Sequence, residues 1–331
     1  MLLVAFFFSG TSETFSQNNT QIRGFVHANA SYNPTDKLTF GLGEQDLFIT
    51  SDLTDRLFFL GETVFKFDPT SPTDFSVSIE RIVLKYNIKG NHNLLIGKHH
   101  TPVNYWNDTY HHGRVFFPTI DRPLLFSTEI FPLHTTGVSL QGLNLGKLKF
   151  GYDVMLGNGL GSTDILDNDQ HKSLTVAMHV KPYKDLRIGA SLYHDVLSKG
   201  AELHDSHTMA WDLKEKLVTA SIANFGKKFE LLTESMLGFT RTDSTGTRRS
   251  VSSYLYAGYK ATDTLTPYIR IDNLHYQDGE LGFHKNNTNS YIAGLRYQIN
   301  YLAVIKLEYQ HQNSEMHSAL DQIATQIAIG F

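Results

Sequence analysis

The sequence contains no cysteine among its 331 residues. The chain therefore has no disulfide scaffold, thiolate zinc site, iron–sulfur cluster or cysteine nucleophile. It also lacks a large net charge, with a formal value of −4 at pH 7 and no run of lysine and arginine. This excludes the electrostatic footprint of a DNA- or RNA-binding protein, so we expect no nucleic acid partner. With 41% apolar and only 19% charged residues, the composition predicts a large folded structure.

Long hydrophobic runs are also missing. The longest extends from Leu2 to Phe8, whereas a helix needs roughly 20 apolar residues to cross a bilayer. The run is followed by the polar stretch Ser9 to Gln17, a pattern that predicts a secretory signal over residues 1–17. Because no lysine or arginine precedes Leu2, a buried apolar strand is the alternative. We expect residues 18–331 to form a single domain.

From Thr20 onward the chain shows the alternation of β-strands. Between Leu302 and His311, apolar and polar side chains occupy opposite faces of the predicted strand. Sixteen segments of about ten residues have this pattern. The connections after even-numbered segments are short, such as Asn300 with Tyr301. Those after odd-numbered segments are mostly longer, and the longest is Thr101 to Leu133.

An even number of strands, with short turns at one end and long loops at the other, is typical of a bacterial outer-membrane barrel. The sequence therefore predicts an all-β fold, a transmembrane antiparallel up-and-down β-barrel of about 16 strands. Lipid cannot satisfy a free backbone N–H or C=O group, so a sheet in a membrane has to close on itself. A soluble β-sandwich or β-propeller is the alternative, but no repeat of about forty residues supports a propeller.

Two further features follow from the alternation. Aromatic residues lie beside the tight turns, as in an interfacial girdle: Tyr86, Tyr183, Phe225, Tyr259 and Tyr301. In the segment from Phe75 to Ile88, the alternation of apolar and polar residues shifts by one position near Glu80 and Arg81. This shift predicts a β-bulge.

The face opposite the apolar one carries charges of both signs, and we expect these side chains to line the lumen. They are Arg23, Glu62, Lys149, Asp153, His179, Lys181, Arg187, Glu230, Glu234, Arg270, Asp272, Arg296, Lys306 and Glu308. Facing rows of opposite charge would sort solutes by charge and dipole. The alternative is a solvated wall without selectivity.

The stretch Gly97-Lys98-His99-His100-Thr101-Pro102, continuing into Tyr105-Trp106-Asn107 and Tyr110-His111-His112-Gly113, resembles the strand-to-loop passage of porins related to the phosphate-selective porins. The resemblance implies a sixteen-stranded porin, commonly trimeric, whose loop after the fifth strand folds into the lumen. The charge pattern differs from that family, because the loop has Arg114 and Arg122 but no ladder of arginine and lysine. Phosphate selectivity is therefore not expected from these residues.

The last strand, Asp321 to Phe331, alternates and ends in an aromatic residue. It looks like the terminal signal of Gram-negative outer-membrane proteins, which the barrel-assembly machinery recognises. We therefore assign Phe331 as an assembly signal.

We expect the loop over 101–133 to form a pore constriction. Its apolar stretches, Val115 to Phe117 and Leu124 to Phe126, need a surface to pack on. The charged and histidine side chains assigned to the constriction are Lys98, His100, Asp108, His111, His112, Arg114, Asp121 and Arg122. The loop histidines His111 and His112, with His99, His100 and Asp108 nearby, are of residue types that bind divalent transition ions. Their spacing matches no zinc motif, so polar packing is favoured over metal binding, and no metal or cofactor is assigned.

The predicted function is passive diffusion of small hydrophilic solutes or ions through an outer-membrane porin. The expected partners are outer-membrane lipid, the assembly machinery and further copies in a homotrimer. A non-channel barrel for assembly or lipid handling is an alternative. An outer-membrane hydrolase is a further one, although neither a G-x-S-x-G nor an H-E-x-x-H motif occurs. We expect no enzymatic activity.

Overall fold

The computed structural model describes residues 19–68, 70–110, 113–128, 130–160, 167, 169, 171–202, 208–280, 286–316 and 318–331. The predicted secretory signal, His111 and His112 lie outside these residues. The strands of the described part are β1 (Thr20–Asn33), β2 (Lys37–Asp52), β3 (Leu57–Phe67), β4 (Phe75–Lys89), β5 (His92–His100), β6 (His134–Leu145), β7 (Phe150–Gly157), β8 (Ser173–Tyr183), β9 (Leu186–Leu197), β10 (Leu213–Phe225), β11 (Phe229–Thr242), β12 (Gly246–Tyr259), β13 (Leu265–Tyr276), β14 (Thr288–Asn300), β15 (Ala303–Ser314) and β16 (Leu320–Gly330).

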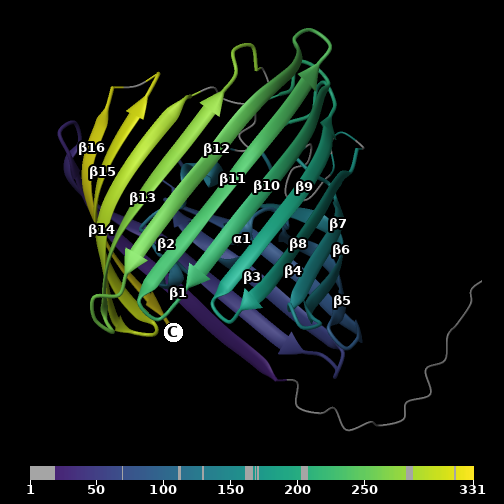
Figure 1. The fold of residues 1–331 in the computed structure, drawn as a ribbon, viewed down its shortest axis with the longest axis horizontal. Helices are drawn as coiled ribbons and strands as arrows, with labels where there is room; N and C mark the ends of the chain where they lie inside the picture. Colours follow the sequence, from purple (N-terminus) through teal and green to yellow (C-terminus); the bar gives the residue numbers. More distant parts are fainter. Residues whose placement is uncertain are drawn as a thin grey trace, which may run out of the picture.

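Each strand pairs antiparallel with its neighbours in the sequence, and β1 pairs with β16, so the sheet is a closed barrel (Figure 1). The predicted fold class, a sixteen-stranded antiparallel barrel, is confirmed. Closure gives the edge strands a partner and removes the exposed sheet edge. Three short helices, α1 (Tyr105–Thr109), η1 (Arg114–Phe116) and η2 (Leu124–Ser127), lie between β5 and β6. Within the described residues, none of the helices has the length and apolar character to span a membrane.

The two faces of the sheet have opposite chemistry. On β15, the side chains of Ile305, Leu307 and Tyr309 are 38%, 47% and 48% exposed on the outside, while Lys306 and Glu308 between them are 0% and 5% exposed. A soluble protein places its apolar residues inside and its charges outside. This barrel does the reverse, because the alternation of the sequence has period two and a strand turns successive side chains to opposite faces.

The aromatic side chains at the short turns follow the prediction at four of five positions. Tyr86, Tyr183, Tyr259 and Tyr301 are all exposed. The prediction for Phe225 is wrong: its ring is partly buried and packs on the rings of Tyr105 and Tyr110 from the β5–β6 connection, with centroids 6.5 and 6.2 Å away. Its position at the end of β10 could not show that a distant loop covers it.

The predicted β-bulge in β4 is confirmed. Glu62 pairs with Arg81 and Thr63 pairs with Ile79, so Glu80 is the extra residue. Ile79 and Ile82 on either side are both exposed. Because of the insertion, two successive residues make buried polar contacts: Glu80 meets His134 and Arg81 meets Glu62.

Candidate functional site: a loop packed inside the barrel

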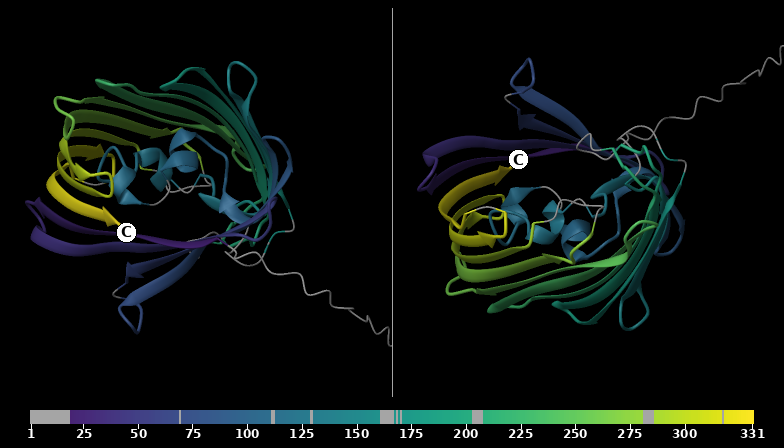
Figure 2. Two further views of the ribbon diagram at one scale, coloured as in Figure 1. Left: turned by 90° about the horizontal axis from the view of Figure 1, so that it is seen from below. Right: turned by 90° about the horizontal axis from the view of Figure 1, so that it is seen from above.

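The described residues of the connection from β5 to β6, 101–110, 113–128 and 130–133, lie within the ring of strands, as both views along the barrel show (Figure 2). Among its apolar side chains, Phe116 is 49% exposed. Most of the others are buried: Trp106 is 1% exposed, Phe117 and Ile130 are 0% exposed, and Leu125 is 1% exposed. They form one cluster with residues of the inner wall, including Tyr193, Leu217, Leu232, Met236, Tyr254, Tyr256, Tyr268 and Ile292. The inner wall therefore supplies the surface that the apolar stretches of the loop need.

Charged side chains of the wall bind the backbone of this loop. On β15, the ammonium of Lys306 donates to the carbonyls of Arg114 at 2.6 Å and Thr119 at 3.0 Å. The neighbouring carboxylate of Glu308 accepts from the N–H of Ile120 at 2.7 Å. Backbone groups inside the barrel have no strand partner here, and these side chains satisfy them.

The same arrangement recurs on β13. The guanidinium of Arg270 donates to the hydroxyl of Thr119 at 2.7 Å and to the carbonyl of Asp121 at 2.6 Å. Asp272 pairs with Arg270 at 2.8 Å and accepts from the N–H of Leu124 at 3.3 Å. Each charge is thus paired as well as hydrogen-bonded, which offsets the cost of removing it from water.

On β11, Glu234 accepts hydrogen bonds from the N–H groups of Tyr105 and Trp106 at the start of α1. Glu230 on the same strand forms a two-bond pair with Arg296 of β14, both at 2.8 Å. Arg296 in turn donates to the carbonyl of Pro118 at 3.4 Å.

The residues that sequence parity assigned to the lumen therefore fall into two groups. One group is buried against the loop: Glu230, Glu234, Arg270, Asp272, Arg296, Lys306 and Glu308. Lys149, Asp153, Lys181 and Arg187 form the other group. Arg187 contacts the loop through the side chain of Asp108 at 3.1 Å, and Lys149 is exposed in the turn before β7. The alternation of the sequence identified the side chains of the inward face, but it could not show which part of that face the loop covers.

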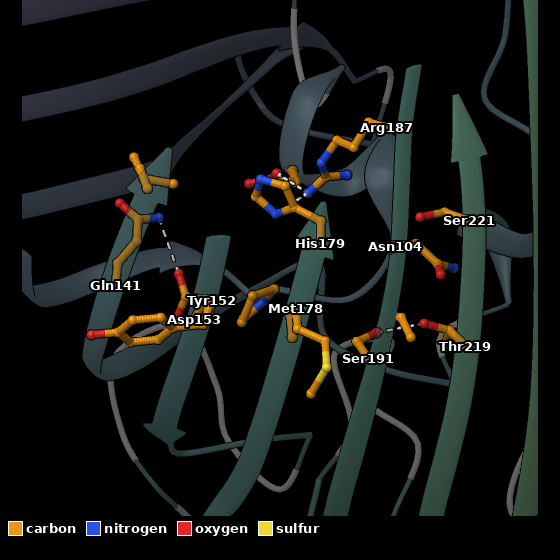
Figure 3. A pocket seen from close by; sticks show the side chains of 16 residues that line it. Asn104, Gln141, Tyr152, Asp153, Met178, His179, Arg187, Ser191, Thr219 and Ser221 are labelled. Atoms are coloured by element: carbon orange, nitrogen blue, oxygen red, sulfur yellow. Dashed lines mark hydrogen bonds and ion pairs between the residues drawn. The ribbon is translucent and has the colours of Figure 1, made fainter. Parts of the chain in front are cut away.

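Among the described residues, two neighbouring cavities lie between the loop and the wall on the side of β2 to β10. The smaller has about 50 Å³, and Figure 3 shows side chains of β6 to β10 converging on it, with Asn104 contributed by the loop. The larger has about 390 Å³ and is lined in addition by Arg81, Lys85 and Asp52. Both cavities are lined by Pro102, Asp108, Gln141 and Asp153.

Charges of both signs face these cavities. Arg187 contacts Asp108 of α1 at 3.1 Å and the Nδ1 atom of His179 at 3.2 Å, while Gln141 donates to Asp153 at 3.1 Å (Figure 3). Enclosure by the barrel raises the pKa of Asp108, and the positive charges of Arg187 and Lys181 oppose this shift. About half of the Asp108 side chain, 48%, stays accessible from the cavity.

The other residues assigned to the constriction are dispersed. Lys98 donates to the carbonyl of Ile79 at 2.6 Å. Arg114 pairs with Asp121 at 3.4 Å, and burial, with Arg114 nearby, lowers the pKa of Arg122. His100 lies at the end of β5 with its ring 5.1 Å from that of His134.

The side chains of the larger cavity that sequence reasoning missed include Asp52, Arg81, Lys85 and Gln141. The parity change in β4 was the available signal for Arg81. No comparable signal marked Gln141, because an uncharged residue on an inward face does not stand out in a sequence.

No protein-family model and no curated protein matches the chain. Solved structures match its fold. The anion-selective porin from Comamonas acidovorans has a TM-score of 0.70 and 10% identity over 95% of this chain and 100% of that one. The outer membrane channel DcaP of Acinetobacter baumannii has a TM-score of 0.67 and 13% identity over 98% and 100%. The trimer form of OmpT, an outer membrane protein of Vibrio cholerae, has a TM-score of 0.69 and 10% identity over 95% and 99%. The chain therefore has the fold of these outer-membrane porins, and at such identities the likeness extends to the fold alone.

Proposed function

We propose that the chain is an outer-membrane porin, a water-filled channel for passive diffusion of small hydrophilic solutes or ions. One observation carries the proposal: the connection between β5 and β6 is bound inside a closed barrel by charged side chains of the wall. Such a loop narrows the lumen without filling the space beside it, where two cavities remain.

The outer face supports a membrane setting. Its large apolar side chains include Ile305, Leu307, Ile327 and Ile329, all exposed. Covering each of them would contribute about 1.5–3 kcal/mol, and lipid provides that cover around a barrel whose own hydrogen bonds are closed. The proposed location is the outer membrane, reached after removal of residues 1–17 and with the help of the barrel-assembly machinery. The proposal includes a homotrimer and no catalytic activity.

The lining supports a passage that sorts solutes by charge and dipole rather than a phosphate-selective one. Arg187, Arg81 and Lys85 face the cavities together with Asp108, Asp153 and Asp52. A phosphate-selective channel would need rows of arginine and lysine side chains, with fewer carboxylates facing them than the three found here. The transverse field between the two signs favours small zwitterionic or weakly charged solutes.

Conductance of the purified chain in a planar bilayer tests the proposal. The folded protein, identified by its faster gel mobility before boiling than after, should produce discrete conductance steps. The same sample after boiling should produce none. Folded protein without conductance would contradict the channel and favour a barrel for assembly or lipid handling. Recovery as a soluble periplasmic protein would contradict the membrane setting itself.

A further inference from the structure

We infer that Glu62, His100 and His134 form a binding site for a divalent transition-metal ion of the zinc type. Each residue offers one ligand atom, and these atoms all lie within 4.8 Å of one another. The residues come from three places in the sheet: the middle of β3, the last position of β5 and the first position of β6. Of the residues considered for metal binding from the sequence, His100 belongs to this site, whereas Glu62 and His134 were not among them.

The two histidines are fixed opposite each other by the sheet. His100 and His134 are register partners at the end of the β5–β6 ladder. Their ring centroids are 5.1 Å apart, with planes inclined at 42°. Backbone pairing holds their Cα atoms whether or not a metal is bound, so little ordering is needed before the ion binds.

The environment of His134 is that of a metal ligand. Its Nδ1 atom lies 3.0 Å from a carboxylate oxygen of Glu80. Histidines that bind metals generally donate the other ring N–H to a carboxylate, which fixes the ring and increases its basicity. With Nδ1 engaged by Glu80, the ring would bind the ion through Nε2. The β-bulge brings Glu80 to this position.

Glu62 supplies the anionic ligand. Its side chain is fully buried, and one carboxylate oxygen is bound by Arg81. The other oxygen, Oε1, is buried and has no hydrogen-bond partner among the described residues. A buried carboxylate oxygen in this state is costly, and coordination to a cation would satisfy it. Arg81 offsets part of the negative charge, while Glu80 adds a second carboxylate beside His134.

The ligand set selects the class of metal. Two imidazoles and one carboxylate suit zinc, cobalt, nickel or copper, whereas magnesium and calcium prefer sites made of oxygen atoms alone. In a tetrahedral zinc site with ligands at about 2.0–2.1 Å, the ligand atoms lie about 3.3 Å apart. The ligand atoms would thus have to approach one another by at most about 1.5 Å. His100 also lines the larger cavity, through which an ion can reach the site.

The bound ion would join both ends of the loop to β3. His100 directly precedes Thr101, and His134 directly follows Leu133, so the site holds the residues at which the loop leaves and re-enters the wall. Metal binding would therefore restrain the loop inside the barrel. This consequence rests on the proposed position of the loop in a channel, whereas metal binding itself does not require an open pore.

Titration of the untagged, folded protein in detergent with cobalt(II) or zinc(II) alone tests the inference. We expect one tight equivalent per chain and, for cobalt, visible absorption bands of a tetrahedral site. His100→Gln and His134→Gln should each weaken the affinity at least about tenfold, and Glu80→Gln about 10–100-fold as a positioning residue. The matched control is His311→Gln, because His311 also faces a carboxylate, Asp321, at 2.9 Å but belongs to no such group among the described residues.

A second measurement needs no variant. The paramagnetic NMR spectrum of the cobalt-loaded wild-type protein should contain hyperfine-shifted ring N–H signals from two coordinated histidines. Equal binding by the wild type and the His100→Gln/His134→Gln double variant, or a cobalt-loaded spectrum without shifted histidine signals, would overturn the inference. Tight binding without conductance would preserve the metal site and contradict only the channel.

Discussion

Lys306 shows how a single residue of the inner wall acts on the loop. Its fully buried ammonium donates to the carbonyls of Arg114 and Thr119 and to the side chain of Gln326. Lys306→Met keeps the length of the side chain but leaves two loop carbonyls without this donor, each at a cost of about 1–3 kcal/mol. We expect a normally assembled barrel with larger and noisier single-channel conductance. Lys149→Met, at an exposed turn position, should match the wild type, and an identical record for both variants would contradict this role.

Asp108 and Arg187 are the charge pair best placed to set ion selectivity. Asp108→Asn should shift the reversal potential in a potassium chloride gradient toward anions, and Arg187→Gln should shift it toward cations. Acidification of the wild type should act like Asp108→Asn. Because the pKa of Asp108 is raised, this carboxylate takes up its proton at a higher pH than an exposed aspartate does. In Asp108→Asn the acid-induced shift should be reduced, and a shift of unchanged size would assign it to another group.

In the proposed channel, the loop over 101–133 is the element that narrows the lumen. Deleting about fifteen residues around Trp106 to Phe117 removes α1, η1 and the aromatic cluster between them. We expect single-channel conductance to rise at least about twofold, since the narrowest section dominates the resistance of a pore. The control is deletion of residues 315–318, in the connection from β15 to β16. Unchanged conductance in an assembled deletion mutant would favour a capping role or a contact between subunits.

The elements differ in how well their structure could be predicted from the sequence. Strands such as β15 were predictable because alternation is a local property that every side chain in the segment expresses. The bulge at Glu80 was predictable for the same reason, as a local break in parity. The meeting of Glu62 with His134 was not, because it depends on that bulge, on the β5–β6 register and on the packing of side chains from separate strands. The contact of Phe225 with Tyr105 is likewise a property of packing.

At the scale of the whole molecule, closure of the sheet depends on one pair of strands far apart in the sequence. Gly24 of β1 and Phe331 exchange two backbone hydrogen bonds of 2.9 Å at the end of the β1–β16 seam. The ring of Phe331 lies over Gly24, where a Cβ atom would come within 2.3 Å of it. Two solved structures share this fold over nearly the whole chain at only 10% and 13% sequence identity. This fits a fold determined by the alternation of apolar and polar residues and by closure of the sheet, rather than by particular residues.

Phe331→Asp should therefore impair assembly of the whole barrel. The change removes the ring that covers Gly24 and puts a charge among exposed apolar neighbours such as Ile327 and Ile329, where a membrane makes it costly. We expect a large loss of the heat-modifiable form in membrane fractions, measured by gel mobility with and without boiling. Ser314→Asp, at the opposite end of the adjacent strand β15, is the control and should assemble normally. Phe331→Tyr keeps an aromatic ring over Gly24 and should restore most of the yield, whereas equal yields for Phe331→Asp and Ser314→Asp would show that the seam closes without this residue.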